Sequence, residues 1–171
     1  SRLPARTDAQ GQPVLLLDQD RARWDHLLVR RGLAALDKAE QLARAGHAWG
    51  PYALQGAIAA CHARARQAQD TDWPHIVALY DALLQVAPSP VVALNRAVAV
   101  GMAEGPEAAL ALVDALSVDP LLRHYHWLPS VRGDLLAKLG RGDEARAEFE
   151  RAAGLTRNAQ EKALLLARAC G

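Results

Sequence analysis

The fold is decided by residues 128–158, LPSVRGDLLAKLGRGDEARAEFERAAGLTRN, which have the pattern of two short helices joined by a tight turn. Apolar residues recur at helical spacing in the first half and predict one buried stripe: Leu128, Val131, Leu135, Leu136 and Leu139. Gly140 interrupts this run, and glycine readily takes the left-handed conformation that ends a helix. The pattern therefore predicts a helical hairpin that turns at Gly140.

The second helix of this hairpin carries a small, bulky, small pattern at Ala145, Phe149 and Ala152. That pattern lets a neighbouring helix approach closely while one ring fills the gap. The hairpin resembles a tetratricopeptide unit, because small and bulky residues stand at four positions of that motif: Gly133, Ala145, Phe149 and Ala152. It departs from the motif at three others, where an aromatic, a leucine and a proline are preferred: Pro129, Arg132 and Arg157.

The composition of the 171-residue chain favours helices packed closely on helices. Hydrophobic residues make up 51%, yet aromatic residues only 5%, and alanine and leucine supply the difference. The net charge of +1 comes from interleaved acidic and basic side chains, so we expect no direct nucleic-acid binding. No run is long and apolar enough for a membrane span, and the two cysteines suggest no disulfide framework. These features fit a cytoplasmic protein.

The chain before the hairpin divides into a leader and a helical region. Residues 1–18 lack helical periodicity, and we interpret them as an extended leader that links the helices to something N-terminal. Residues 19–171 are predicted to form a single helical domain. Its first helix begins after Gln19 with Asp18 or Asp20 as cap, and Trp24, Leu27, Leu28 and Leu36 on its inner side.

Three helix pairs follow the first helix. The second helix of each pair carries a bulky residue, Tyr80, Val113 or Phe149, at intervals of 33 and 36 residues. Tetratricopeptide arrays have periods near 34. We therefore expect an all-α, tetratricopeptide-like helical repeat array of about three pairs, capped by the first and last helices. An irregular helical bundle is the alternative. The helical segment SPVVALNRAVAVGM (89–102) is apolar nearly all round, which predicts a central, buried position.

Enzyme motifs are absent from the sequence. It contains no glycine-rich phosphate loop, no G-x-S-x-G elbow, no H-E-x-x-H and no paired C-x-x-C. His124 and His126 supply two metal ligands without an obvious third, so no metal site is expected. Cys61 follows an alanine-rich apolar face and is interpreted as a small buried hydrophobe. We expect no catalysis, no cofactor and no catalytic residues.

Polar residues lie on or beside the apolar stripe of each pair's first helix. In tetratricopeptide arrays the first helices line the concave surface, so these residues are candidates for one partner- or ligand-binding groove: Gln55, His62, Asn95, Arg96, Tyr125, His126 and Arg132. The alternative is that these polar groups form hydrogen bonds with one another or with turn carbonyls inside a packed domain. A buried Arg or Asn side chain must be paired in this way.

Several long strings resemble the C-terminal extension of bacterial extracytoplasmic-function RNA polymerase sigma factors. They are DQDRARWD (18–25), GPYALQGAIAACHA (50–63), TDWPHIVALYDALL (71–84), SPVVALNRAVAV (89–100) and the stretch 125–167. The resemblance covers residues 15–170. In that family, sigma regions 2 and 4 bind the polymerase and read the promoter, and neither region is present in these 171 residues.

The resemblance implies a regulatory role in transcription initiation without catalysis. The implied partners are proteins: the sigma factor's own regions 2 and 4, the RNA polymerase core, or a small YCII-related protein with an Asp-Gly-Pro-Phe motif, since such proteins are often encoded beside family members. The family offers no settled binding residues to transfer. The alternative function is a small-molecule-sensing regulatory domain, with a polar pocket between the first helices of the repeats.

Overall fold

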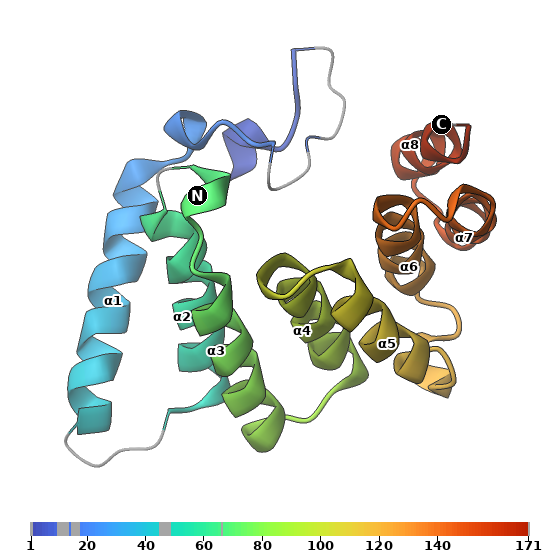
Figure 1. The fold of residues 1–171 in the computed structure, drawn as a ribbon. Coiled ribbons are helices and arrows are strands. Elements are labelled where there is room, and N and C mark those ends of the chain that lie inside the picture. The colour runs from blue at the N-terminus through green and yellow to red at the C-terminus, as the bar shows by residue number, and fades with distance from the viewer. Residues whose placement is uncertain (1, 10–13, 15–17, 45–48, 66, 171) are drawn as a thin grey trace. The chain divides into compact units, whose positions relative to one another are not determined.

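The computed structural model describes every residue except 1, 10–13, 15–17, 45–48, 66 and 171, and it describes no side chains for residues 42–44. The described residues form eight α-helices and short 3₁₀ turns, with no extended strand among them. The predicted all-α class is confirmed. The chain divides into two compact units, residues 1–87 and 88–171 (Figure 1). The predicted single domain over 19–171 stays a prediction.

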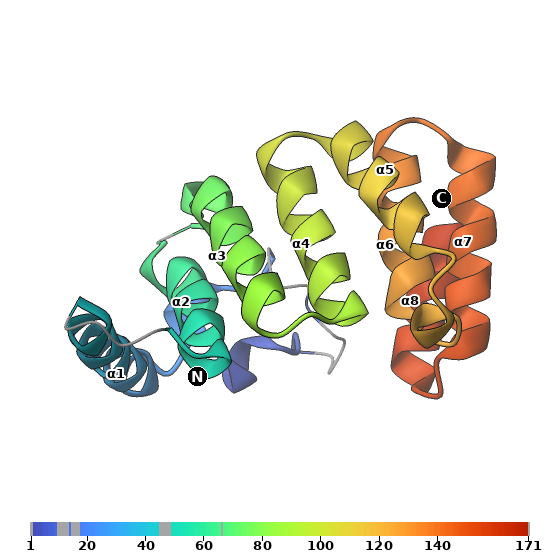
Figure 2. The same cartoon turned by 90° about the horizontal axis from the view of Figure 1, so that it is seen from below.

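Unit 1 contains η1 (Leu3–Ala5), η2 (Arg21–Arg23), α1 (His26–Arg44), α2 (Pro51–Arg64), η3 (Ala68–Asp70) and α3 (Trp73–Val86). Its three α-helices lie side by side, with α2 in contact with both α1 and α3 (Figures 1 and 2). One small buried cluster joins them, formed by Leu36, Ala57 and Ala60. Leu33, Trp49 and Leu79 pack against that cluster and are only partly buried.

The start of α1 differs from the prediction. The helix begins at His26, where the Asp25 carboxylate accepts a hydrogen bond from the Leu28 amide at 3.0 Å. Asp20 instead caps η2 by accepting from the Ala22 amide. The predicted inner positions Leu27 and Leu28 are 51% and 49% exposed, because the chain enters α1 through a 3₁₀ turn and a break rather than a continuous helix.

Unit 2 contains α4 (Pro90–Ala103), α5 (Pro106–Leu116), η4 (Pro120–Leu122), α6 (Trp127–Lys138), α7 (Gly142–Leu155) and α8 (Ala159–Ala169). Each α-helix contacts the next one along the chain, and α4 also contacts α6 (Figure 2). One continuous core runs from Leu94 on α4 to Ala169 on α8. Val91 and Val98 are each 38% exposed, so the expectation that α4 is buried all round is wrong.

The hairpin over residues 128–158 forms as predicted, as α6 and α7. Leu128, Leu135 and Leu136 are buried in the core. Gly140 ends α6 with φ of +74°, and the Gly140 and Arg141 amides donate to the carbonyls of Ala137 and Leu136. These two hydrogen bonds satisfy backbone carbonyls that would otherwise have no partner at the end of the helix. A left-handed residue is required there, so the local sequence fixes the turn.

Close approach of α6 and α7 depends on Gly133. A Cβ at this position would lie 2.8 Å from Cε1 of Phe149 and 3.2 Å from the Ala145 carbonyl oxygen. Phe149 is 2% exposed and Ala152 is fully buried. The small, bulky, small pattern therefore packs as the sequence predicts. Asn158 caps α8 by accepting from the amides of Gln160 and Glu161.

Candidate functional site

The seven predicted groove residues are distributed over both units. Gln55 and His62 lie on α2 in unit 1. The other five lie in unit 2: Asn95 and Arg96 on α4, Tyr125 and His126 immediately before α6, and Arg132 on α6. Only Tyr125 and His126 contact each other among the described contacts, with ring centroids 5.9 Å apart. A single groove shared by all seven residues stays a prediction.

In unit 2, Arg132 is the centre of an ion-pair network across three helices. Its Nε donates to Oδ1 of Asp114 on α5 at 2.7 Å, and its Nη1 donates to Oε1 of Glu148 on α7 at 3.1 Å. The hydrogen bond that Arg132 donates to Asp114 raises the pKa of Arg132 above its usual value. Glu148 also accepts from Arg151. Arg132 stands at a position where the tetratricopeptide motif prefers leucine, and here it makes ionic contacts with both neighbouring helices.

The other predicted residues of unit 2 have different surroundings. His126 lies 3.5 Å from the Glu161 carboxylate at the start of α8, and that carboxylate also accepts from the Thr156 hydroxyl. Asn95 is exposed, so it belongs to no enclosed polar network. Arg96 is partly buried and has an interaction partner. The described contacts therefore do not join His126, Asn95 and Arg96 in one polar cluster.

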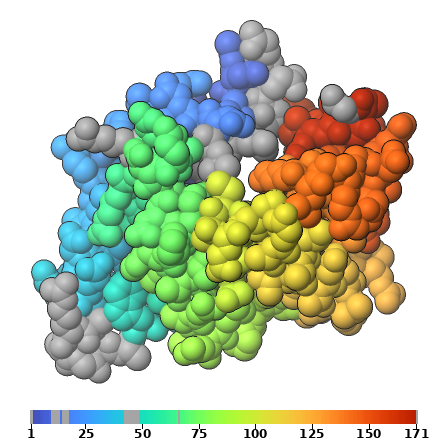
Figure 3. Space-filling view, viewed as in Figure 1, coloured from blue at the N-terminus to red at the C-terminus, as the bar shows by residue number. Residues whose placement is uncertain are grey.

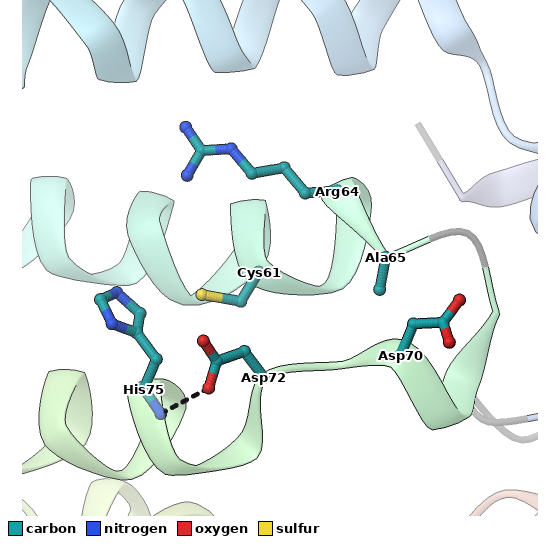
Figure 4. Close-up of a pocket in the computed structure, with 6 residues that line it drawn as sticks. All are labelled: Cys61, Arg64, Ala65, Asp70, Asp72 and His75. Atoms are coloured by element: carbon teal, nitrogen blue, oxygen red, sulfur yellow. Dashed lines mark hydrogen bonds between the residues drawn. The ribbon is translucent and has the colours of Figure 1, made fainter.

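Unit 1 contains an open pocket of about 490 Å³ between α2 and the start of α3. Its lining residues are Cys61, Arg64, Ala65, Asp70, Asp72 and His75 (Figure 4). Figure 4 shows Cys61, Asp72 and His75 facing the same space. Arg64 is directed toward α1, where it lies 3.6 Å from Asp37. Asp72 also caps α3 by accepting from the His75 amide at 3.1 Å.

The chemistry of this pocket is that of a polar recess rather than a nucleophile site. Cys61 was interpreted as a small buried hydrophobe, but it is only partly buried and its side chain lines the pocket. Burial, followed by the charge of Asp72, raises the pKa of Cys61, which keeps the thiol protonated and weakly nucleophilic. No group of three or more potential metal ligands occurs among the described residues.

A second polar cluster lies beside the C-terminal end of α2 and is built around Arg21. Its guanidinium donates to the carbonyl oxygens of His62 and Ala65, and to Oγ1 of Thr71 at 3.1 Å. Those carbonyls have no partner within α2, so Arg21 caps the helix end from 41 and 44 residues away. Figure 3 shows the N-terminal segment, in blue, close to the green segment that follows α2.

His62, one of the predicted groove residues, belongs to this cluster. Its ring meets the Trp73 ring edge to face, with centroids 5.3 Å apart, and its Nδ1 is buried without a hydrogen-bond partner. Burial, then the charges of Arg2 and Arg21, lower its pKa to about 4. His62 is therefore neutral at pH 7. Arg2 and Arg21 were not predicted as part of a polar cluster, because no local sequence pattern reveals a contact across more than 40 residues.

Comparisons with known proteins give one family match and one similar sequence. Residues 1–40 match a family described as a family of unknown function (DUF6596). An uncharacterized protein of Rhizobium meliloti (strain 1021) is 50% identical over 165 residues. The match covers 96% of this chain but only 38% of the relative, so the chain spans well under half of that protein. No solved structure matches the chain significantly. Within the described residues, no helix has both the length and the apolar character to cross a membrane.

Proposed function

We propose that the chain is a non-catalytic, protein-interaction domain that regulates an extracytoplasmic-function sigma factor. The observation that carries this proposal is the repeated packing of two helical hairpins in unit 2. Ala97, Ala109 and Val113 on α4 and α5 are buried at the same relative positions as Gly133, Ala145 and Phe149 on α6 and α7, 36 residues later. This repetition supports a tetratricopeptide-like arrangement.

A repeat scaffold of this kind favours a binding role. Stacked hairpins bury their small residues between helices and leave polar side chains on the outer faces, where another polypeptide can bind. The long strings at residues 18–25, 50–63, 71–84 and 89–100, which resemble the sigma-factor extension, support the link to transcription. The relative's greater length is consistent with a chain that works beside further domains. Candidate partners are sigma regions 2 and 4, RNA polymerase core and a YCII-related protein.

A deletion experiment tests the proposal. The intact protein is compared with a version lacking residues 19–171 in transcription from its target promoter with purified polymerase. We expect the deletion to change the amount of transcript. Adding the isolated chain back in trans, with Phe149→Ala as a destabilised control, tests whether the effect depends on the stability of the folded domain. Unchanged transcription on deletion would contradict a regulatory role.

The pocket in unit 1 favours a second candidate, a small-molecule-sensing domain. Its volume of about 490 Å³ is within the range of ligand sites, and its lining mixes a thiol, an imidazole and carboxylates. It is lined by α2, η3 and α3 rather than by Asn95 or Arg132, so it is not the pocket that the sequence analysis suggested. Filling it with Ala65→Phe tests this candidate: altered regulation with an unchanged circular-dichroism spectrum favours sensing, and unchanged regulation opposes it.

A further inference from the structure

Two guanidinium groups converge on one buried indole in unit 1. The Cζ atoms of Arg2 and Arg21 lie 6.0 and 5.3 Å from the centroid of the Trp24 ring. The two Cζ atoms are therefore no more than about 11 Å apart, since each is within about 6 Å of the same ring. Trp24 is 5% exposed and fixes the position of both side chains. Arg2 belongs to the turn at η1 and Arg21 to η2, and these elements contact each other.

Arg21 is held rigidly yet keeps hydrogen-bond donors to spare. Its Nη1 makes two hydrogen bonds to backbone carbonyls and its Nη2 makes one to Thr71. A guanidinium has five N–H donors, so the Nε–H and one Nη2–H have no described acceptor. In Arg141 these same two nitrogens hold the Glu144 carboxylate in a fork, at 2.7 Å each. The fork of Arg21 is thus an oriented site for two acceptor oxygens.

Neither guanidinium forms an ion pair with a described carboxylate, although the charge of Asp70 acts favourably on Arg21. Six other arginines among the described residues form ion pairs: Arg64, Arg132, Arg141, Arg146, Arg151 and Arg168. Burial lowers the pKa of both Arg2 and Arg21. The neighbouring charge of Arg6 lowers the pKa of Arg2 further, whereas the charge of Asp70 partly offsets the effect of burial on Arg21. Partly buried cations whose charge is incompletely compensated are unfavourable, so an anion bound by them is stabilising.

Two further polar atoms in the same cluster lack partners. The Nε1–H of Trp24 and the Nδ1 of His62 are buried and make no hydrogen bond. Buried polar groups in folded proteins are nearly always paired, and unpaired ones mark places where a bound group is missing. Burial, and then the charges of Arg2 and Arg21, lower the pKa of His62. Both residues with unpaired atoms contact Arg21, Trp24 through its ring and His62 through its backbone carbonyl.

We propose that Arg2 and Arg21 form a binding site for an oxyanion, a carboxylate or a phosphate group. The free fork of Arg21 receives two oxygens of the anion, and Arg2 supplies the second positive charge. The chemistry fits two sources, which are an acidic side chain of a bound polypeptide and a free small anion. The site does not depend on the proposed function, because the groups that form it lie within unit 1 of the isolated chain.

Nuclear magnetic resonance on the 171-residue chain tests the site. The Trp24 indole Nε1–H and the Arg21 Nε–H are followed at pH 7 during separate additions of sodium phosphate, sodium acetate and hexaglutamate, with sodium chloride at matched ionic strength as the control. We expect a saturable shift of both resonances. Saturation with phosphate or acetate identifies a free-anion site, and saturation with hexaglutamate alone identifies an acidic polypeptide. The pKa of His62 should also rise above about 4 in the bound state.

Variants separate this site from general charge effects. Arg2→Gln removes a charge without touching the bonds of Arg21 to α2, and it should weaken binding about tenfold. Arg21→Lys keeps the charge but loses the fork, and it should weaken binding at least as much. Arg23→Gln, an exposed position in the same turn, is the matched control and should bind normally. The proposal is overturned if no addition gives a saturable shift, if chloride gives the same shift, or if Arg2→Gln binds like the unchanged chain.

Discussion

The two units of the chain differ in how their interiors are built. Unit 2 has one continuous apolar core in which small residues and the Phe149 ring interlock. Unit 1 has a buried cluster of Leu36, Ala57 and Ala60, other buried residues such as Ile76 and Leu83, an open polar pocket, and two arginines around Trp24. The buried side-chain polar atoms without a partner in the described structure all lie in unit 1, on Gln19, Trp24 and His62.

The difference between the two interiors indicates which unit contributes most to stability and which carries candidate binding sites. Regular packing of complementary helices satisfies nearly every group, so it leaves little that a ligand can add. An interior with unpaired polar atoms and incompletely compensated charge is less stable alone and gains more from a partner. We therefore regard unit 2 as the scaffold and unit 1 as the part that carries the candidate small-ligand and anion sites.

The largest predicted effect comes from Phe149→Ala. The ring is 2% exposed and lies under the guanidinium of Arg168, whose Cζ is 4.4 Å from the ring centroid. Its removal leaves a cavity and should lower the free energy of unfolding by about 3–5 kcal/mol. Leu79→Ala in the smaller core of unit 1 should cost less than about 2 kcal/mol, since Leu79 is only partly buried. Urea unfolding followed by circular dichroism measures both variants. Equal losses of unfolding free energy would remove the distinction between the units.

Alanine at two glycines should have opposite effects. Gly133→Ala places a methyl group 2.8 Å from the Phe149 ring and close to backbone, so overpacking exceeds the gain in helix propensity and costs about 1–2 kcal/mol. Gly32→Ala in α1 meets nothing within 4 Å and should stabilise by roughly 0.5–1 kcal/mol. Thermal unfolding of both variants measures the signs. A stabilising Gly133→Ala would show that α6 and α7 do not approach as closely as described.

Removing the charge of Arg132 should cost about 1–2 kcal/mol. The Arg132 side chain is 22% exposed and Glu148 is 14% exposed, so Arg132→Met leaves a partly buried carboxylate with only Arg151 as partner. Arg146→Met, which breaks the exposed pair with Glu150, is the control and should change stability by less than about 0.5 kcal/mol. Urea unfolding at low and high salt measures both. Equal effects of the two variants would show that the Arg132 network is only a surface contact.

The pH dependence of stability should carry a contribution from His62. Its pKa is about 4 in the folded chain against 6.5 as its usual value, so the unfolded chain binds the proton first. This contribution to stability is fully present above pH 6.5 and is lost as the pH falls toward 4. Solvent screening reduces the loss to about 1 kcal/mol. His62→Gln should flatten the unfolding curve between pH 6.5 and 4, relative to the unchanged chain. An unchanged slope would place His62 in solvent.

The sequence was sufficient wherever neighbouring residues determine structure. The helical spacing of Leu128, Leu135 and Leu136 and the turn at Gly140 are local patterns, and both were predicted correctly. The start of α1 was predicted wrongly because Asp20 and Asp25 are equally suitable caps in sequence, and only the 3₁₀ turn between them decides which one is used.

The candidate sites were less predictable because they depend on distant parts of the chain. His62 was chosen for its place on an apolar stripe, but its surroundings come from Arg2, Arg21 and Trp73. Arg132 was chosen as an anomaly in the motif, and its partners Asp114 and Glu148 lie on two other helices. Periodicity identifies a polar residue on an inner face, whereas its partner depends on how separate helices pack.

Residue-resolved hydrogen exchange on the 171-residue chain tests the contrast between the units most directly. We predict that amides in the middle of α6 and α7 exchange most slowly, because their hydrogen bonds open only when the core of unit 2 is lost. Amides in η2 and the first half of α1 should exchange roughly 100-fold faster. Equal protection of α1 and α6, or slower exchange in α1, would contradict the account.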